Sequence, residues 1–172
     1  MNTQIEFILQ RKSRRRFGPT EVSDAQIEEV LRAAMAAPTA KNVQPWHFVI
    51  IRDAQTMARM AEALPYAKML AGASIAIAVC GDTEVHTGES APNWVIDCAA
   101  ATENLLLALE AQRLAAVWTA AYPYEDRMAV LRENLGLPEH IVPLNIIPIG
   151  GIADDAPALD KWKPERIHKE RW

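Results

Sequence analysis

Apolar residues follow two spacings along this chain, and the spacings predict a regular alternation of helices and strands. Helical spacing, capping residues or both predict five helices, over residues 3–10, 24–37, 53–64, 94–112 and 125–135. Runs of apolar and β-branched residues predict four strands, over residues 46–51, 74–80, 114–119 and 144–149. The strand over 74–80 is apolar on both faces, so we expect it at the centre of the sheet.

Several helix ends are marked by residues that satisfy or replace open backbone amides. Ser23 and Gln26 form a capping-box pattern ahead of the second helix. That helix should end before Pro38, since proline has no amide hydrogen and disfavours a helical residue ahead of it. Gly136 is expected to end the helix over 125–135.

The helix over 94–112 is apolar on nearly all sides, so it must be covered on most of its surface. A chain of this size has room for one such core helix, and its remaining apolar surface favours contact with a second subunit. Because the helices are few and this one is long, we expect an α+β fold with a mixed central sheet flanked by helices. A doubly wound parallel sheet is the less favoured architecture.

Composition limits the class of protein. The 172 residues are half apolar and carry a net charge of −4, which is typical of one globular domain over residues 1–172. Residues 151–172 are polar and proline-spaced but keep two tryptophans, so we expect a C-terminal arm that lies on a surface. The apolar runs are too short for a membrane span, and the first residues do not resemble a signal peptide. Cys80 and Cys98 are expected to be buried thiols in the cytoplasm.

Positive charge is concentrated in one short segment, where residues 11–16 contain five lysines and arginines. In an extended backbone, Arg11, Ser13 and Arg15 would face one way, and Arg14 and Arg16 the other. Arginine gives two parallel donors to phosphate oxygens and a serine hydroxyl adds a third contact, so the segment suits a phosphate. A solvated basic loop or a nucleic-acid contact stays open from charge alone, although the acidic net charge argues against a general nucleic-acid binder.

A second polar segment follows the second helix. Asn42 and Gln44 each offer a donor and an acceptor beside Trp46, which suits the polar edge and flat face of a heterocycle. Pro38 and Pro45 bracket the segment. An ordinary loop capped by asparagine is the alternative interpretation. Together the two segments could hold both ends of a phosphorylated aromatic cofactor.

Other chemistries find little support in the sequence. No glycine-rich phosphate loop, GxSxG motif or activated cysteine is present, and no histidine stands at metal-ligand spacing from another ligand. We therefore expect no metal and no protein nucleophile. This pattern is typical of enzymes in which a cofactor supplies the chemistry.

The chain resembles the FMN-dependent nitroreductase family over almost its whole length. Residues 11–17 are similar to the family's R-R-S-x-R-x-F opening, and residues 37–48 to its A-P-S-x-x-N-x-Q-P-W-x-F segment, with Thr39 for the usual serine. Residues 97–108 resemble its long central helix, and residues 149–151 its late glycine turn. A basic residue for the phosphate is expected at Lys161 or Lys163.

The resemblance implies an intertwined homodimer with a long buried central helix and two FMN sites at the subunit interface. Arg11, Lys12, Ser13 and Arg15 would hold the phosphate and ribityl chain, with Lys161 closing over the phosphate. The segment that meets the flavin at the dimer interface would supply Pro38, Thr39, Ala40, Asn42 and Gln44. The backbone at Ala120 would face the reactive flavin nitrogen, and Gly150 and Gly151 complete the implied cofactor-binding set.

The implied activity is transfer of two electrons from NADH or NADPH, through FMN, to a nitroaromatic, quinone or related small-molecule acceptor, in alternating half-reactions. The loop over 82–93 is where acceptor shape would be set. Three alternatives stay open: a family relative that performs reductive dehalogenation or flavin cleavage, a non-catalytic flavin-binding protein, and a nucleic-acid contact through residues 11–16.

Overall fold

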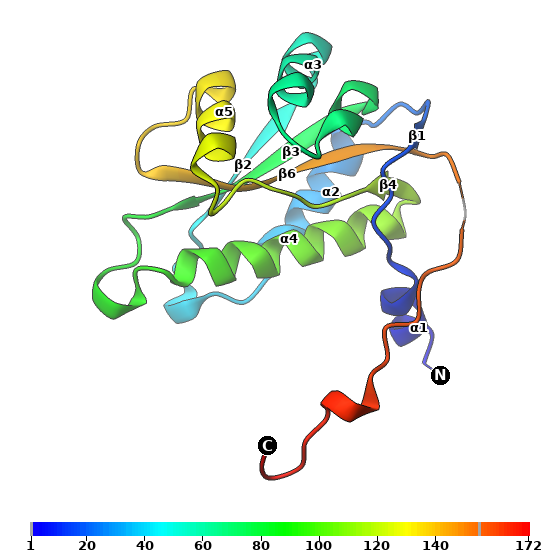
Figure 1. Cartoon of the computed structure of the whole chain (residues 1–172), viewed down its shortest axis with the longest axis vertical. Coiled ribbons are helices and arrows are strands. Elements are labelled where there is room, and N and C mark those ends of the chain that lie inside the picture. The colour runs from blue at the N-terminus through cyan, green and yellow to red at the C-terminus, as the bar shows by residue number, and fades with distance from the viewer. Residues whose placement is uncertain (1, 155) are drawn as a thin grey trace.

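The computed structural model describes residues 2–154 and 156–172 of the chain. One six-stranded sheet organises these residues, with β1 (Phe17–Gly18), β6 (Ile141–Ile152), β3 (Ile75–Asp82) and β2 (Trp46–Ile51) in that spatial order. Two short strands, β4 (Leu114–Ala116) and β5 (Thr119–Ala120), also pair with β6. Figure 1 shows β3 and β6 at the centre of the fold.

The expected α+β class is confirmed, but the sheet differs from the mixed sheet that we expected. Each pair of strands that the structure describes is antiparallel. The strand predicted over 144–149 is longer, at Ile141–Ile152, because it runs along β3 and then continues past it to β1 and β4. The strand predicted over 114–119 is divided into β4 and β5.

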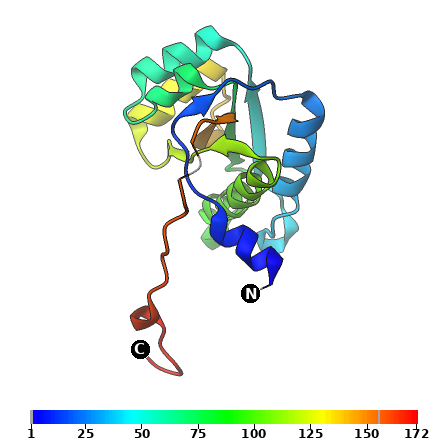
Figure 2. The same ribbon diagram turned by 90° about the vertical axis from the view of Figure 1, so that its right-hand side faces the viewer.

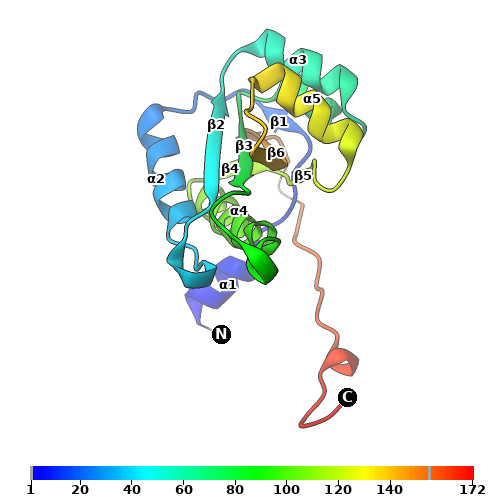
Figure 3. The same cartoon turned by 90° about the vertical axis from the view of Figure 1, so that its left-hand side faces the viewer.

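Helices cover both faces of the sheet. The two helices α2 (Asp24–Met35) and α4 (Asn93–Ala111) lie on one face, while α3 (Ala54–Ala63) and α5 (Glu125–Leu135) lie on the other (Figure 3). A strand with apolar residues at every position suits this arrangement, since alternate side chains point to opposite faces. In β3, Ile75, Ile77 and Val79 pack with α2 and α4, whereas Ala76 and Ala78 pack with α3 and α5.

The predicted helix ends agree closely with the structure. Ser23 and Gln26 form both hydrogen bonds of a capping box ahead of α2. Asp53 caps α3 by accepting the backbone N–H of Thr56 at 2.8 Å, and hydrogen bonds from Thr56 lower the pKa of its carboxyl. Gly136 ends α5 in the left-handed conformation, at φ 63°, which glycine adopts at little cost.

Two terminal segments remain largely uncovered. Helix α1 (Thr3–Gln10) contains no buried residue, and its Ile5, Ile8 and Leu9 are exposed. Beyond β6 the tail extends away from the body of the chain, past α1 (Figures 1 and 2). Trp162 and Trp172 in this tail are exposed. The expectation that the arm lies on a surface is therefore not met within one chain, because none of the described elements covers these side chains.

None of the helices in the described part of the chain is long and apolar enough to cross a membrane.

Candidate functional site

The basic segment 11–16 is extended and joins α1 to β1. The expected alternation is met only in part, because Arg14 is buried whereas Arg16, expected on the same side, is exposed and lines the same cavity as Arg15. Arg14 points inward, where its guanidinium pairs with Glu110 of α4 through two hydrogen bonds, one of 3.0 Å from Nη2 to Oε1. The backbone N–H of Arg14 donates to the carbonyl of Ala116 in β4 at 2.9 Å. Arg14 therefore anchors the segment to the core, with its neighbours left at the surface.

The neighbours of Arg14 line a cavity of about 360 Å³ together with the start of the C-terminal tail. Its lining comprises Arg11, Lys12, Ser13, Arg14, Arg15, Arg16, Asp154, Ala156, Pro157, Leu159 and Lys161. The basic side chains greatly outnumber the single carboxylate. Five predicted site residues, Arg11, Lys12, Ser13, Arg15 and Lys161, are thus brought together. Such a cavity is suited to an anion.

Charge within this cavity is only partly neutralised by neighbouring carboxylates. Arg11 Nε lies 3.2 Å from Glu103, which is half-exposed, and Arg16 lies 3.6 Å from Asp154. Arg15, Ser13 and Lys161 are exposed and have no hydrogen-bond or ion-pair partner among residues 2–154 and 156–172. These three side chains can therefore bind a ligand without first breaking a hydrogen bond or an ion pair within the described part of the protein.

The carboxamide segment lies between α2 and β2 and has an unusual backbone. Lys41, Asn42 and Gln44 all adopt left-handed conformations, with φ of 55°, 55° and 52°. Residues other than glycine seldom adopt this conformation, and clusters of such strain are found at functional sites. Gln44 Nε2 donates to Asn42 Oδ1 at 3.0 Å, and the Gln44 N–H donates to Thr39 Oγ1 at 3.3 Å. Pro38, Asn42 and Gln44 remain exposed, so their polar groups are available to a ligand.

The two predicted halves of the site lie at opposite ends of α4 in a single chain (Figure 1). Ala40 is hydrogen-bonded to Asp97 near the start of α4, whereas Arg14 pairs with Glu110 near its end. At 1.5 Å per residue these positions are separated by about 20 Å along the helix. The basic cavity contains no residue of segment 38–44. One chain therefore does not bring the two segments into a common cavity.

The remaining predicted site residues lie in or beside β6. Gly150 and Gly151 do not form a turn, because they continue β6 between β1 and β4. A Cβ at Gly150 would lie 2.7 Å from Cβ of Phe17, so glycine here allows β1 to approach closely. Ala120 pairs with Asn145 of β6, and its carbonyl accepts a hydrogen bond from Arg127 Nη1 at 3.4 Å.

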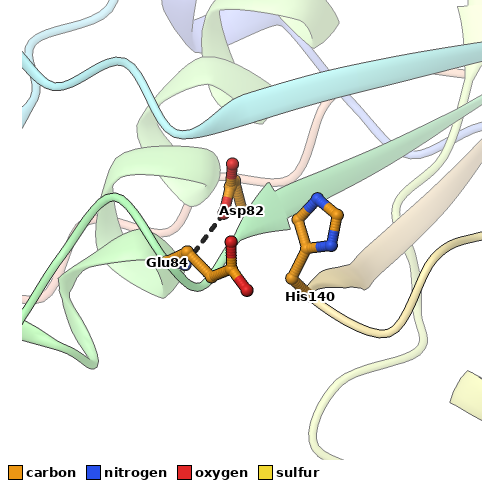
Figure 4. Close-up of side chains that lie close together, drawn as sticks. All are labelled: Asp82, Glu84 and His140. Atoms are coloured by element: carbon orange, nitrogen blue, oxygen red, sulfur yellow. Dashed lines mark hydrogen bonds between the residues drawn. The ribbon is translucent and has the colours of Figure 1, made fainter.

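The fold also assembles two polar groups that sequence analysis missed. His86 and Asp97 are buried and joined through Nε2 and Oδ2 at 2.9 Å. Asp82, Glu84 and His140 converge where β3 ends and β6 begins, with one possible ligand atom from each within 4.8 Å of the others (Figure 4). Glu84 also donates its backbone N–H to Asp82 Oδ1 at 2.8 Å, so the carboxylate shapes the turn. His140 is distant in sequence from both acids, and no local spacing could indicate the cluster.

Cys80 and Cys98 are free and buried, as predicted. Burial raises the pKa of each thiol to about 12. Because the thiolate is the reactive form, at pH 8 only about one thiol in 10⁴ is ionised. We expect both cysteines of the native protein to resist iodoacetamide at pH 8 and to be alkylated in urea, as counted by mass spectrometry. Rapid alkylation of the native protein would contradict the burial of these thiols.

An antiparallel sheet covered on both faces, with a cationic cavity formed by side chains, defines an α+β protein suited to holding a small anionic group. The model of the nitroreductase family matches residues 8–65 and 62–151. The chain belongs to the nitroreductase family.

Relatives match over the full length of the chain. A protein of Archaeoglobus fulgidus, provisionally described as an NADH dehydrogenase/NAD(P)H nitroreductase, is 42% identical and covers 100% of both chains. A crystal structure with the same provisional description, from Parabacteroides distasonis, has a TM-score of 0.95 and 44% identity over 100% of both chains. A structure from Desulfovibrio desulfuricans, provisionally described as a nitroreductase and in complex with FMN, has a TM-score of 0.85 and 29% identity over 100% of this chain and 99% of that one.

Proposed function

We propose that this chain is an FMN-dependent oxidoreductase that passes two electrons from NADH or NADPH to a nitroaromatic, quinone or related small acceptor. The observation on which the proposal depends is the basic cavity in which Arg11, Lys12, Ser13, Arg15 and Lys161 converge. Membership of the nitroreductase family and the FMN named for the Desulfovibrio structure support it.

The donor set of the cavity fits the phosphate end of FMN. Guanidinium and ammonium groups compensate the phosphate charge, and the Ser13 hydroxyl offers a shorter-range hydrogen bond. The extended backbone, anchored by Arg14, presents these groups without a glycine-rich loop. When bound, the flavin would accept a hydride and return two electrons, so the protein's part is to bind, orient and polarise.

The ring end of the cofactor would be held by segment 38–44, with Thr39, Asn42 and Gln44 as polar contacts. Because this segment lies about 20 Å from the basic cavity along α4, we propose that a second copy of the chain supplies it. The uncovered apolar side chains of α1, Ile96 on α4 and the tryptophans of the tail support such a homodimer. Pro38, Ala40, Ala120, Gly150 and Gly151 remain predictions as cofactor contacts.

Several finer assignments accompany this proposal. We propose that residues 1–172 form one domain, that the tail wraps over the partner in the dimer, and that donor and acceptor use the same site in turn. Two free, buried cysteines support a reducing, cytoplasmic setting.

The proposal is tested on the purified full-length protein by visible absorption, before and after soaking in excess FMN. We expect a flavin spectrum, loss of its colour on anaerobic mixing with NADH or NADPH, and recovery on adding a nitroaromatic or a quinone. A protein that stays colourless, with no FMN complex in calorimetry, would overturn the assignment. A bound flavin that neither nicotinamide reduces would favour a non-catalytic flavin-binding protein, and a reduced flavin that neither acceptor reoxidises would favour dehalogenation or flavin cleavage.

A further inference from the structure

The loop between β3 and α4 has one buried anchor. Its residues from Thr83 to Pro92 are exposed or half-buried except His86, which is 3% exposed. Within the described part of the chain, the hydrogen bond from this imidazole is made to Asp97 of α4. Thr83 attaches the start of the loop to β6, because its backbone N–H and its hydroxyl each donate to the carbonyl of His140 at 3.0 Å. The His86 contact therefore fixes the middle of the loop to α4.

Asp97 is itself buried, at 6% exposure, and both of its carboxylate oxygens are used. Oδ2 lies 2.9 Å from His86 Nε2, and Oδ1 accepts the backbone N–H of Ala40 at 3.2 Å. The contacts of Asp97 therefore reach one side chain in the loop and one backbone group in segment 38–44. A buried carboxylate that lacks hydrogen-bond partners destabilises the folded state. The positions of Asp97, His86 and Ala40 therefore depend on one another.

The hydrogen bond to Ala40 has no substitute in segment 38–44. The other hydrogen bonds of this segment are internal, from Gln44 to Thr39 and Asn42 and between backbone groups. Among the described residues, Asp97 is the group outside the segment that bonds to it. The left-handed residues Lys41, Asn42 and Gln44 need support from their surroundings to persist, and Asp97 is the external part of that support.

We infer that Asp97 is a positioning residue that holds the ring-binding segment 38–44 in its strained conformation. Through His86, it couples that segment to residues 83–92, which lie within the loop over 82–93 where acceptor shape is expected to be set. The inference rests on the proposed function where it concerns flavin, and on the protein alone where it concerns the two segments. The flavin-ring contacts and the loop would then be held as one unit by a single buried carboxylate.

The first test is hydrogen–deuterium exchange on the full-length protein without FMN. Asp97→Ala is expected to accelerate exchange in peptides covering 38–44 and 83–92 by about tenfold or more, because it removes both hydrogen bonds. The matched control is Asn104→Ala on the same helix, whose amide bonds the carbonyl of Ala33 in α2. The control should leave both peptides unchanged. Wild-type exchange in both peptides of a folded Asp97→Ala protein would overturn the inference.

The second test uses flavin binding and separates the ring end from the phosphate end. Asp97→Ala is expected to weaken the binding of FMN and of riboflavin by a similar factor, about tenfold to a hundredfold. It should also shift the absorption spectrum of the bound flavin. Asp97→Asn keeps an acceptor for Ala40, so it should restore most of the affinity. Equal loss in the Asn and Ala variants, or an unchanged spectrum with unchanged affinity in Asp97→Ala, would overturn the role of this hydrogen bond.

A third variant keeps the inference testable if Asp97→Ala does not fold. Ala40→Pro removes the donor while leaving Asp97 intact, and Ala40 opens a short 3₁₀ turn, a type of position that proline tolerates. Ala40→Pro should weaken flavin binding as Asp97→Ala does. The double variant, Ala40→Pro with Asp97→Ala, should bind flavin no more weakly than the weaker-binding single variant. Wild-type flavin affinity in Ala40→Pro would contradict the inference. If the wild-type protein binds no flavin, the proposed function fails, and exchange in the two segments still decides the structural coupling.

Discussion

Glu110→Ala is expected to lower the free energy of unfolding by about 3–5 kcal/mol, the largest loss of stability that we predict for a single side chain. The side chains of Arg14 and Glu110 are 6% and 14% exposed, so removal of the carboxylate deletes a two-point ion pair of a buried guanidinium. The two-point contact also anchors the basic segment. We expect urea unfolding of the apo protein, followed by circular dichroism, to report this loss.

Two comparisons separate a buried ion pair from a general effect of losing a glutamate. Glu28→Ala removes an exposed partner of Arg32, and such pairs contribute about 0.5 kcal/mol or less. The double variant Arg14→Met with Glu110→Leu should recover much of the stability, because both charges leave the interior together. If Glu110→Ala costs no more than Glu28→Ala, then Arg14 is not an anchor of the segment.

Arg15→Ala is expected to weaken FMN binding by about 1.5–3 kcal/mol, which is roughly a tenfold to 150-fold rise in Kd. The guanidinium of Arg15 lies at the basic cavity and has no ion-pair partner among the described residues, so it can give charge-assisted hydrogen bonds to a phosphate. The protein should accumulate in apo form, and isothermal titration calorimetry with FMN measures the change directly.

Riboflavin provides the control for the phosphate assignment. It lacks the phosphate, so Arg15→Ala should leave its affinity nearly unchanged, whereas loss of the ring contacts would weaken both ligands alike. Arg32→Ala removes the same charge from the exposed face of α2 and should leave FMN affinity at its wild-type value. An FMN affinity unaltered by Arg15→Ala would contradict the phosphate role of this residue.

The chain's local patterns determined most of its secondary structure. Capping residues such as Ser23, the left-handed Gly136 and the doubly apolar β3 act over a few neighbouring positions, so the sequence displays them directly. The basic segment is also contiguous, and its alternation correctly indicated that Arg14 turns away from Ser13 and Arg15, but wrongly placed Arg16 with Arg14. Because these basic residues are neighbours in the sequence, the sequence alone could predict that they form a cationic site.

Tertiary structure decided what depends on contacts between distant residues. It paired Arg14 with Glu110, 96 positions away, buried His86 on Asp97, and brought His140 beside Asp82 and Glu84. It also made the described strand pairs antiparallel and attached the carboxamide and basic segments to positions about 20 Å apart along α4. Periodicity and capping report only which residues are neighbours along a helix or strand. Which helix covers which strand, and therefore which charges meet, is set by packing of the whole chain.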